Sequence, residues 1–235
     1  LLPHKYSTLG PSIIKGDVNG DGLEDLHISG ASGQPSQLFL QDSNGSFQLK
    51  NNSAFIKNKA YETVGAIFID GDLDGDLDLY TVNGGNEKPS KTNHYSDHYY
   101  TNDGKGKFVQ RLNIPKIITS GKSIAKGDFD KDGDMDLFIG GRVVPGQYPL
   151  PARSVLLENK KGKFVDVTNS TAPELNEIGL VTDAIFSDYD GDNDLDILVT
   201  GEWMALTVYV NDDNKFTKKS LEDITGIGWW YNINA

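Results

Sequence analysis

The chain has 235 residues, no cysteine and a formal net charge of −12. The lack of cysteine excludes disulfide scaffolds, thiolate zinc sites and cysteine nucleophiles. No apolar run approaches the roughly 18 residues of a membrane-spanning helix, so we expect a chain that does not span a membrane.

The acidic residues are concentrated in four nine-residue segments, which we name loops 1 to 4: residues 17–25, 70–78, 128–136 and 188–196. Loop 1 holds four acidic residues and each of the others five, which is 19 of the 34 in the chain. The only basic residue in the loops is Lys131, and the remainder of the chain has 21 basic and 15 acidic residues. The acidity is therefore local, and this pattern argues against nucleic acid as a partner.

Short apolar segments rich in β-branched residues flank every loop, which predicts strands and not helices. The predicted first strands cover 12–16, 65–69, 123–127 and 181–187, and the second strands cover 26–29, 79–82, 137–139 and 197–200. A third strand follows at 37–41, 98–102, 154–158 and 206–211.

A polar turn rich in Asn, Asp and Gly ends each third strand, and a fourth strand then opens on a phenylalanine (Phe47, Phe108, Phe164 or Phe216). This order is typical of a hairpin. Four short antiparallel strands per repeat, at a repeat length of 53 to 60 residues, predict an all-β propeller of four-stranded blades. We place the blades at about 12–53, 64–113, 122–170 and 180–224.

Two repeats carry additional residues between the second and third strands, roughly 85–97 and 142–153. The first insertion is polar and aromatic, and the second is rich in proline. Because insertions in repeat proteins usually emerge on one face, often the binding face, we expect ligand contacts there.

Residues 229–235 match the strand that precedes each loop, with Ile233 at the position of Ile14 and Ile67. The match predicts the first strand of a fifth blade. We therefore expect the sequence to be a fragment of a longer repeat array with further domains.

Each loop follows the pattern D-x-[DN]-x-D-[GN]-x-x-D, which is an oxygen-rich sequence suited to calcium. Side chains at positions 1, 3, 5 and 9 and the carbonyl of position 7 are the expected ligands, and position 6 must accept a left-handed conformation. We predict four calcium ions, one in each loop. The predicted ligands are Asp17, Asn19, Asp21, Leu23 and Asp25; Asp70, Asp72, Asp74, Asp76 and Asp78; Asp128, Asp130, Asp132, Asp134 and Asp136; and Asp188, Asp190, Asp192, Asp194 and Asp196.

These loops are not EF-hands, because an EF-hand needs a bidentate glutamate at position 12. Position 12 is apolar or threonine here, within a predicted strand: Ile28, Thr81, Ile139 and Val199. Magnesium is a weaker candidate because it requires strict octahedral geometry.

With its four loops, the sequence resembles the FG-GAP/VCBS repeat family, whose blades also build the head of the integrin α subunit. Residues 2–5 (LPHK), 141–149 (GRVVPGQYP) and 201–204 (GEWM) resemble large bacterial VCBS proteins that carry an ASPIC/UnbV-type domain. The resemblance implies a secreted or surface-attached propeller with a structural ion in each loop.

The sequence nominates no catalytic residue and no organic cofactor. His27 lies in a second strand, where packing is the favoured role, whereas His94 and His98 share an aromatic insertion that could bind a sugar or cover a blade edge. Glu87 and Glu202 are the best carboxylates outside the loops. For the three tryptophans, Trp203, Trp229 and Trp230, we favour packing between blades over sugar platforms.

The predicted function is a calcium-binding module for binding or adhesion to a glycan or a protein, acting outside the cell as a bacterial secreted or outer-membrane-attached protein. Millimolar external calcium suits loops of this type. Two alternatives stay open at this point: a polysaccharide-active lyase or hydrolase on the same scaffold, and a structural spacer in a larger surface protein.

Overall fold

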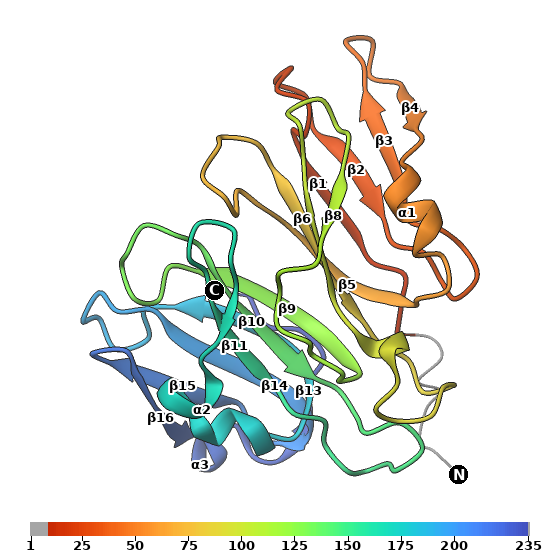
Figure 1. Cartoon of the computed structure of the whole chain (residues 1–235). Helices are drawn as coiled ribbons and strands as arrows, with labels where there is room; N and C mark the ends of the chain where they lie inside the picture. Colours follow the sequence, from red (N-terminus) through yellow and green to blue (C-terminus); the bar gives the residue numbers. More distant parts are fainter. Residues whose placement is uncertain (1–8, 235) are drawn as a thin grey trace.

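The computed structural model describes residues 9–234 and contains four antiparallel sheets of four strands each, in chain order (Figure 1). The first sheet is β1 (Ile13–Gly16), β2 (Asp25–Ile28), β3 (Gln37–Gln41) and β4 (Phe47–Lys50). The second is β5 (Thr63–Ile69), β6 (Asp78–Asn83), β7 (His98–Thr101) and β8 (Val109–Arg111). The third is β9 (Gly121–Gly127), β10 (Asp136–Gly141), β11 (Val155–Glu158) and β12 (Val165–Asp166). The fourth is β13 (Leu180–Ser187), β14 (Asp196–Met204), β15 (Thr207–Asp212) and β16 (Lys215–Ser220), and β17 (Gly228–Trp229) pairs with β14. The all-β prediction is confirmed.

Helices are short and lie in the connections. They are α1 (Ser53–Lys57), α2 (Thr168–Thr171), α3 (Glu222–Thr225) and the 3₁₀ turns η2 (Asn93–Tyr95) and η3 (Pro173–Glu177). No helix in the described part of the chain is long and apolar enough to cross a membrane.

The sheets follow one another like the blades of a propeller, with the first and fourth at the two ends of the row (Figure 1). Their innermost strands β1, β5, β9 and β13 pack in sequence order. Residues from β5, β9 and β13, with Ser12 and Asn232, line a common cavity of about 530 Å³ near the centre. The described chain therefore has a β-propeller-like fold.

Successive side chains of a strand point to opposite faces of a sheet, and this alternation builds the core between sheets. In β7, Tyr100 packs with Leu38 of the first sheet, whereas Tyr99 packs with Leu157 of the third. In β11, Leu156 packs with Tyr209 of the fourth sheet. Each sheet thus has a rear face toward the preceding sheet and a forward face toward the next one.

The rear face of the first sheet has no sheet against it within the described chain. Leu26, Phe39 and Leu49 lie side by side across β2, β3 and β4, and Leu49 is 50% exposed. At the position of Leu26, the other three sheets place Leu79, Leu137 and Ile197, each fully buried under the preceding sheet.

Residues 229–235 were predicted to begin a fifth blade. The structure pairs Gly228 and Trp229 with Met204 and Glu202 of β14, and the chain then passes β13, where the Ile233 amide donates to Asp183 Oδ2 at 3.2 Å. Ala235 lies outside the described residues. The fifth blade and the blade boundaries stay predictions.

Candidate metal centres

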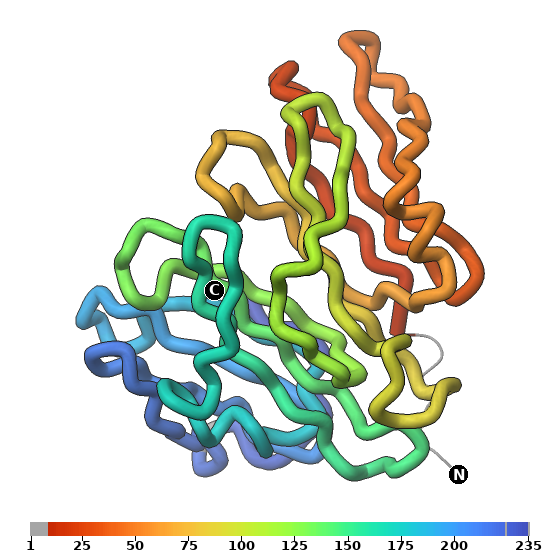
Figure 2. Tube along the Cα trace, viewed as in Figure 1, coloured from red at the N-terminus to blue at the C-terminus, as the bar shows by residue number. Residues whose placement is uncertain are grey.

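The nine-residue loops connect the first and second strands of every sheet and lie along one edge of the molecule, at the upper left in Figure 2. In each loop the carboxylate at position 1 accepts a hydrogen bond from the backbone amide at position 6. The distances are 2.8 Å for Gly22, 3.2 Å for Gly75, 3.1 Å for Gly133 and 3.1 Å for Asn193. All four position-6 residues have a positive φ, between 72° and 93°, so the left-handed turn predicted from the sequence is present.

The turn brings the acidic side chains together. In loops 2 and 4, carboxylate oxygens from positions 1, 3 and 5 lie within 4.8 Å of one another: Asp70, Asp72 and Asp74, and Asp188, Asp190 and Asp192. Loop 3 forms two overlapping clusters, one of Asp128, Asp130 and Asp136 and one of Asp130, Asp132 and Glu158. In loop 1, Asn19 at position 3 donates from Nδ2 to Asp21 Oδ2 at 3.0 Å.

Loop 2 provides a test of whether a cation fits these clusters. Asp70 Oδ1 and Asp72 Oδ1 are both buried and neither accepts a hydrogen bond. Two buried carboxylate oxygens without donors are costly unless a cation neutralises them. The donor set is all oxygen, which suits a hard divalent ion, so the loop residues fit a metal.

The aspartates at position 9 are fully buried and join the loop to the third strand. Asp136 accepts from the Phe129 amide at 3.1 Å and from the Asn159 amide at 2.8 Å, and the same pair of contacts recurs at Asp25, Asp78 and Asp196. Burial, with smaller contributions from nearby carboxylates, raises the pKa of Asp78 to about 6 and that of Asp136 to about 8.

The residues at position 7 donate their amide to the position-5 carboxylate in every loop, at 2.8 to 3.0 Å. Two of their side chains have other partners: Asp134 accepts from the Lys161 amide, and Asp194 pairs with Lys131 of the neighbouring loop. The ligand roles predicted for positions 1, 3, 5, 7 and 9 of each loop stay predictions.

A recurring asparagine at the end of the third strand connects loops 1, 2 and 3 to the next sheet. Asn102, Asn159 and Asn211 donate from Nδ2 to the carbonyls of Val18, Gly71 and Phe129, the position-2 residues of loops 1, 2 and 3, at 2.7, 2.8 and 2.9 Å. The three asparagines are buried. In the sequence they stand at one recurring position of the polar hairpin turns, which indicates a turn but not the contact between sheets. Loop geometry and packing between sheets are therefore coupled.

Glu158 is a second residue that the sequence did not indicate. It ends β11 and reaches the loop 3 cluster, and it also pairs with Lys160 at 2.8 Å. The equivalent positions in the other sheets are Leu40, Thr101 and Val210, so no repeated signal marks it.

Of the three histidines at residues 9–234, two lie in the core. His27 packs against Phe55 and Phe68, and burial lowers its pKa to about 3, so the packing role is supported. His98 is buried beside Tyr61, with its ring centroid 4.4 Å from that of the tyrosine, whereas His94 is exposed. The structure does not present the two insertion histidines as one surface site.

Glu87 and Glu202, which the sequence marked as the best carboxylates outside the loops, both lie close to other charged side chains. Glu202 forms a buried ion pair with Arg142, so its nomination as a free carboxylate is wrong. Glu87 faces Glu62, and burial together with the charge of Glu87 raises the pKa of Glu62 to about 7.

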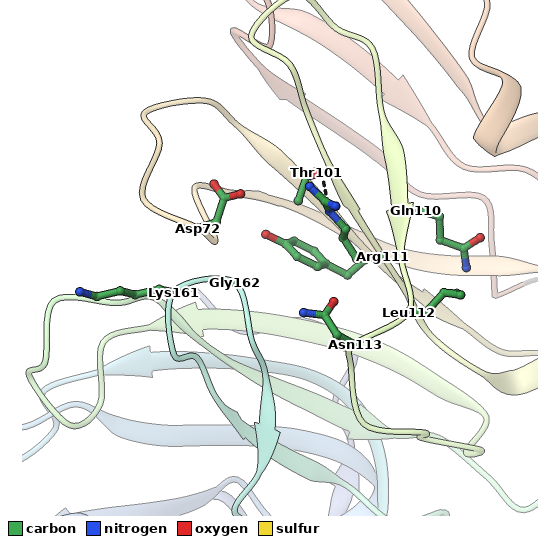
Figure 3. A pocket seen from close by; sticks show the side chains of 9 residues that line it. Asp72, Thr101, Gln110, Arg111, Leu112, Asn113, Lys161 and Gly162 are labelled. Carbon is green, nitrogen blue, oxygen red and sulfur yellow. Dashed lines mark hydrogen bonds between the residues drawn. The ribbon is translucent and has the colours of Figure 1, made fainter.

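Two grooves on the described surface lie near the features named above, one beside loop 2 and one beside the 142–153 insertion. A polar groove of about 600 Å³ lies between the second and third sheets and is shown in Figure 3. Its lining includes Asp72 of loop 2, Arg111 of β8 and Lys161 of the β11–β12 hairpin, and Arg111 Nε donates to Thr101 Oγ1 at 2.9 Å.

The other groove, which we name the aromatic groove, has a volume of about 420 Å³ and lies beside the 142–153 insertion. Its lining includes Tyr148, Pro149, Pro151, Leu180 and Trp203. Trp203 is 57% exposed, so the expectation that it packs between blades is wrong.

Comparisons with known proteins agree with this architecture. No curated protein matches the chain. A solved structure titled "Structural basis of specific recognition of non-reducing terminal N-acetylglucosamine by an Agrocybe aegerita lection" is similar, with a TM-score of 0.57 and 18% sequence identity. The match covers 88% of this chain and 50% of that one, so the chain spans half the length of the solved protein. At this identity the likeness supports the fold alone.

The family model for FG-GAP-like repeats matches residues 17–81 and 70–139, which together span more than half of the chain and include loops 1 to 3. The resemblance to this repeat family is confirmed, whereas the association with an ASPIC/UnbV-type domain stays a prediction. The chain belongs to the FG-GAP-like repeat family.

Proposed function

We propose that the protein is a calcium-stabilised, extracellular binding module that recognises a glycan. Its loops lie along one edge of the molecule, and the 84–97 and 142–153 connections emerge at the opposite ends of the strands (Figure 2). The loops repeat in all four sheets, as expected of a structural element. The connections do not repeat, as expected of a recognition element.

The observation that carries the proposal is the aromatic groove, which lies at the connection end, away from the acidic loops. Small-molecule sites are concave, mostly apolar and equipped with a few polar groups. The lectin named in the solved structure of similar fold recognises a terminal N-acetylglucosamine, and this supports a saccharide as the ligand class.

Calcium is the cation that we assign to the loops. The oxygen-only donor sets and the two buried, unsatisfied carboxylate oxygens in loop 2 support it. Extracellular loops of this type bind at about 10⁻⁴ to 10⁻³ M, and only the exterior of a cell supplies that concentration.

A glycan array probed in calcium and again in chelator tests this function. We expect binding to a restricted set of glycans in calcium and weaker binding in chelator, because the scaffold loosens. Silence across plant, host and microbial glycans would favour the spacer alternative. Release of reducing ends or unsaturated products from a bound polysaccharide would favour an enzyme.

We also propose that a further sheet of the same repeat type, belonging to a longer chain, covers the rear face of the first sheet. The support is continuity with the existing interfaces, since the equivalent face of every other sheet is buried by its neighbour. The variant Leu49→Glu is expected to reduce self-association of the 235-residue chain in sedimentation and to change its stability by less than about 0.5 kcal/mol. A large loss of stability would mean that Leu49 is already packed within this chain.

A further inference from the structure

Trp203 lies at the end of β14, seven residues beyond the last aspartate of loop 4. At about 3.3 Å per residue this strand separates Trp203 from the loop by roughly 23 Å. The aromatic groove is therefore distinct from the metal clusters and from the polar groove of Figure 3, which borders loop 2.

The indole of Trp203 is exposed and yet fixed in place. Its Nε1 donates to the hydroxyl of Tyr148 at 2.6 Å, across 55 residues of sequence. Its ring also makes an edge-to-face contact with Trp229, with centroids 4.9 Å apart and an interplanar angle of 89°. An aromatic ring held in this way loses little conformational entropy when a ligand binds, which favours affinity.

The backbone at Trp203 is unusual. Its φ is +58°, a left-handed conformation that costs a bulky residue about 1 to 3 kcal/mol. The neighbouring side chains of Glu202 and Met204 are buried, whereas that of Trp203 points outward. Glycine would suit this backbone better, so the backbone conformation does not explain a tryptophan here. What the residue supplies is its indole ring, which is exposed and held by Tyr148 and Trp229.

Among the described residues, the only charged side chain that lines the aromatic groove is that of Glu202, and its charge is neutralised by an ion pair. Glu202, which also lines it, is fully buried and paired with Arg142, whose side chain is equally buried. Tyr148, Pro149, Pro151 and Leu180 supply neutral surface. A volume of about 420 Å³ lies within the roughly 300 to 1,000 Å³ range of small-ligand sites.

We propose that Trp203 is the stacking platform of a binding site for a neutral pyranose sugar. The C–H groups on one face of the sugar ring pack on the indole, and its hydroxyl groups lie at the rim, toward Tyr148 and water. This inference rests on the proposed glycan-binding function and assigns the sugar-binding site to the groove around Trp203.

The test uses the full chain in calcium, with methyl β-D-glucopyranoside and sodium glucuronate as probes and the indole N–H resonances of the three tryptophans as the readout. We expect the neutral sugar to shift the Trp203 resonance saturably at millimolar concentration, and the anionic sugar to do so more weakly. Trp203→Gly should weaken binding about tenfold or more, equivalent to about 1.4 kcal/mol.

Two controls make the outcome decisive. Trp203→Gly relieves the positive φ and also removes the contacts with Tyr148 and Trp229, so its melting temperature is measured beside its affinity. Because the two effects oppose one another, we expect a melting temperature close to that of the parent chain, and lost binding at that melting temperature reports the lost ring. Trp230→Ala removes another exposed tryptophan outside the groove and should leave affinity within about twofold.

The groove assignment would be overturned if Trp203→Gly bound the sugar like the parent chain, or if a decaproline peptide shifted the Trp203 resonance and the sugars did not. A glycan array that stays positive for Trp203→Gly would reject this site and leave the proposed function standing. An array that is silent for the parent chain would reject the function itself.

Discussion

Removal of calcium is expected to lower the melting temperature by roughly 20 °C, because each ion that binds only the folded chain stabilises it by RT ln(1 + [L]/Kd). In about 10 mM calcium, a hundredfold excess over a Kd of about 10⁻⁴ M, this is about 2.7 kcal/mol per ion, and four loops would contribute about 11 kcal/mol together. The effect should exceed that of most single substitutions, which cost about 0.5 to 3 kcal/mol.

The loss should extend beyond the loops. Asn102, Asn159 and Asn211 hydrogen-bond to the backbone of the preceding sheet's loop, so a loosened loop also weakens the contact between sheets. Differential scanning calorimetry with and without EDTA measures the shift, and isothermal titration should return four sites. Magnesium is expected to restore the melting temperature only partly.

A matched pair of variants separates a specific site from general charge reduction. Asp188→Asn removes a predicted ligand from loop 4 and should abolish one of the four binding events. Asp213→Asn changes an exposed aspartate in the β15–β16 hairpin and should leave all four. An unchanged melting temperature on chelation would refute the calcium assignment.

The chelated chain should also become more stable as the pH falls from about 8. Burial raises the pKa of Asp136 to about 8 and that of Asp78 to about 6, above their usual range. The folded chain then holds protons that the unfolded chain releases, so stability decreases with rising pH between about 4 and 8. Bound calcium should keep Asp78 and Asp136 ionised, so their part of the pH dependence should disappear in its presence. The part that comes from Glu62, which lies outside the loops and has a pKa raised to about 7, should remain.

The repeated parts of the molecule could be predicted from the sequence because each depends on local chemistry. The pattern of acidic residues indicated the loop turn, including the left-handed position held by Asn193, and alternating apolar residues indicated the strands. The loop and strand pattern recurs in four repeats, and each copy supports the interpretation of the others. A residue without counterparts in the other repeats, such as Trp203, could not be interpreted in this way.

The sequence interpretation failed where a residue's environment is set by a distant partner. Glu202 looked like a free carboxylate because its partner Arg142 lies 60 residues away in the sequence, directly after β10. Trp203 was expected to be buried, but its left-handed backbone turns the indole outward. His98 was grouped with His94 in an insertion that could bind a sugar or cover a blade edge, but its side chain is buried beside Tyr61. None of these relations has a signature in local sequence.

The variant Arg142→Met is expected to lower the free energy of unfolding by about 3 to 5 kcal/mol, because it removes the buried guanidinium that pairs with the buried carboxylate of Glu202. The side chains of the pair are 1% and 0% exposed, and Arg142 also donates from Nη1 to the Leu180 carbonyl at 3.3 Å. For a chain of this size the loss corresponds to roughly 10 °C in melting temperature.

The double variant Arg142→Met with Glu202→Leu shows how much the ion pair contributes to the free energy of unfolding. A buried ion pair often stabilises no more than well-packed apolar residues of similar volume, so the double variant should recover most of the stability that the single variant loses. Thermal and urea unfolding of the parent, both single variants and the double variant give the coupling energy directly.

If Glu202 were instead a catalytic or ligand-binding carboxylate, Glu202→Gln would impair function at unchanged stability. Because the carboxylate neutralises the guanidinium beneath the aromatic groove, we expect Glu202→Gln to be destabilising as well, and to weaken sugar binding only as far as the groove loses its shape.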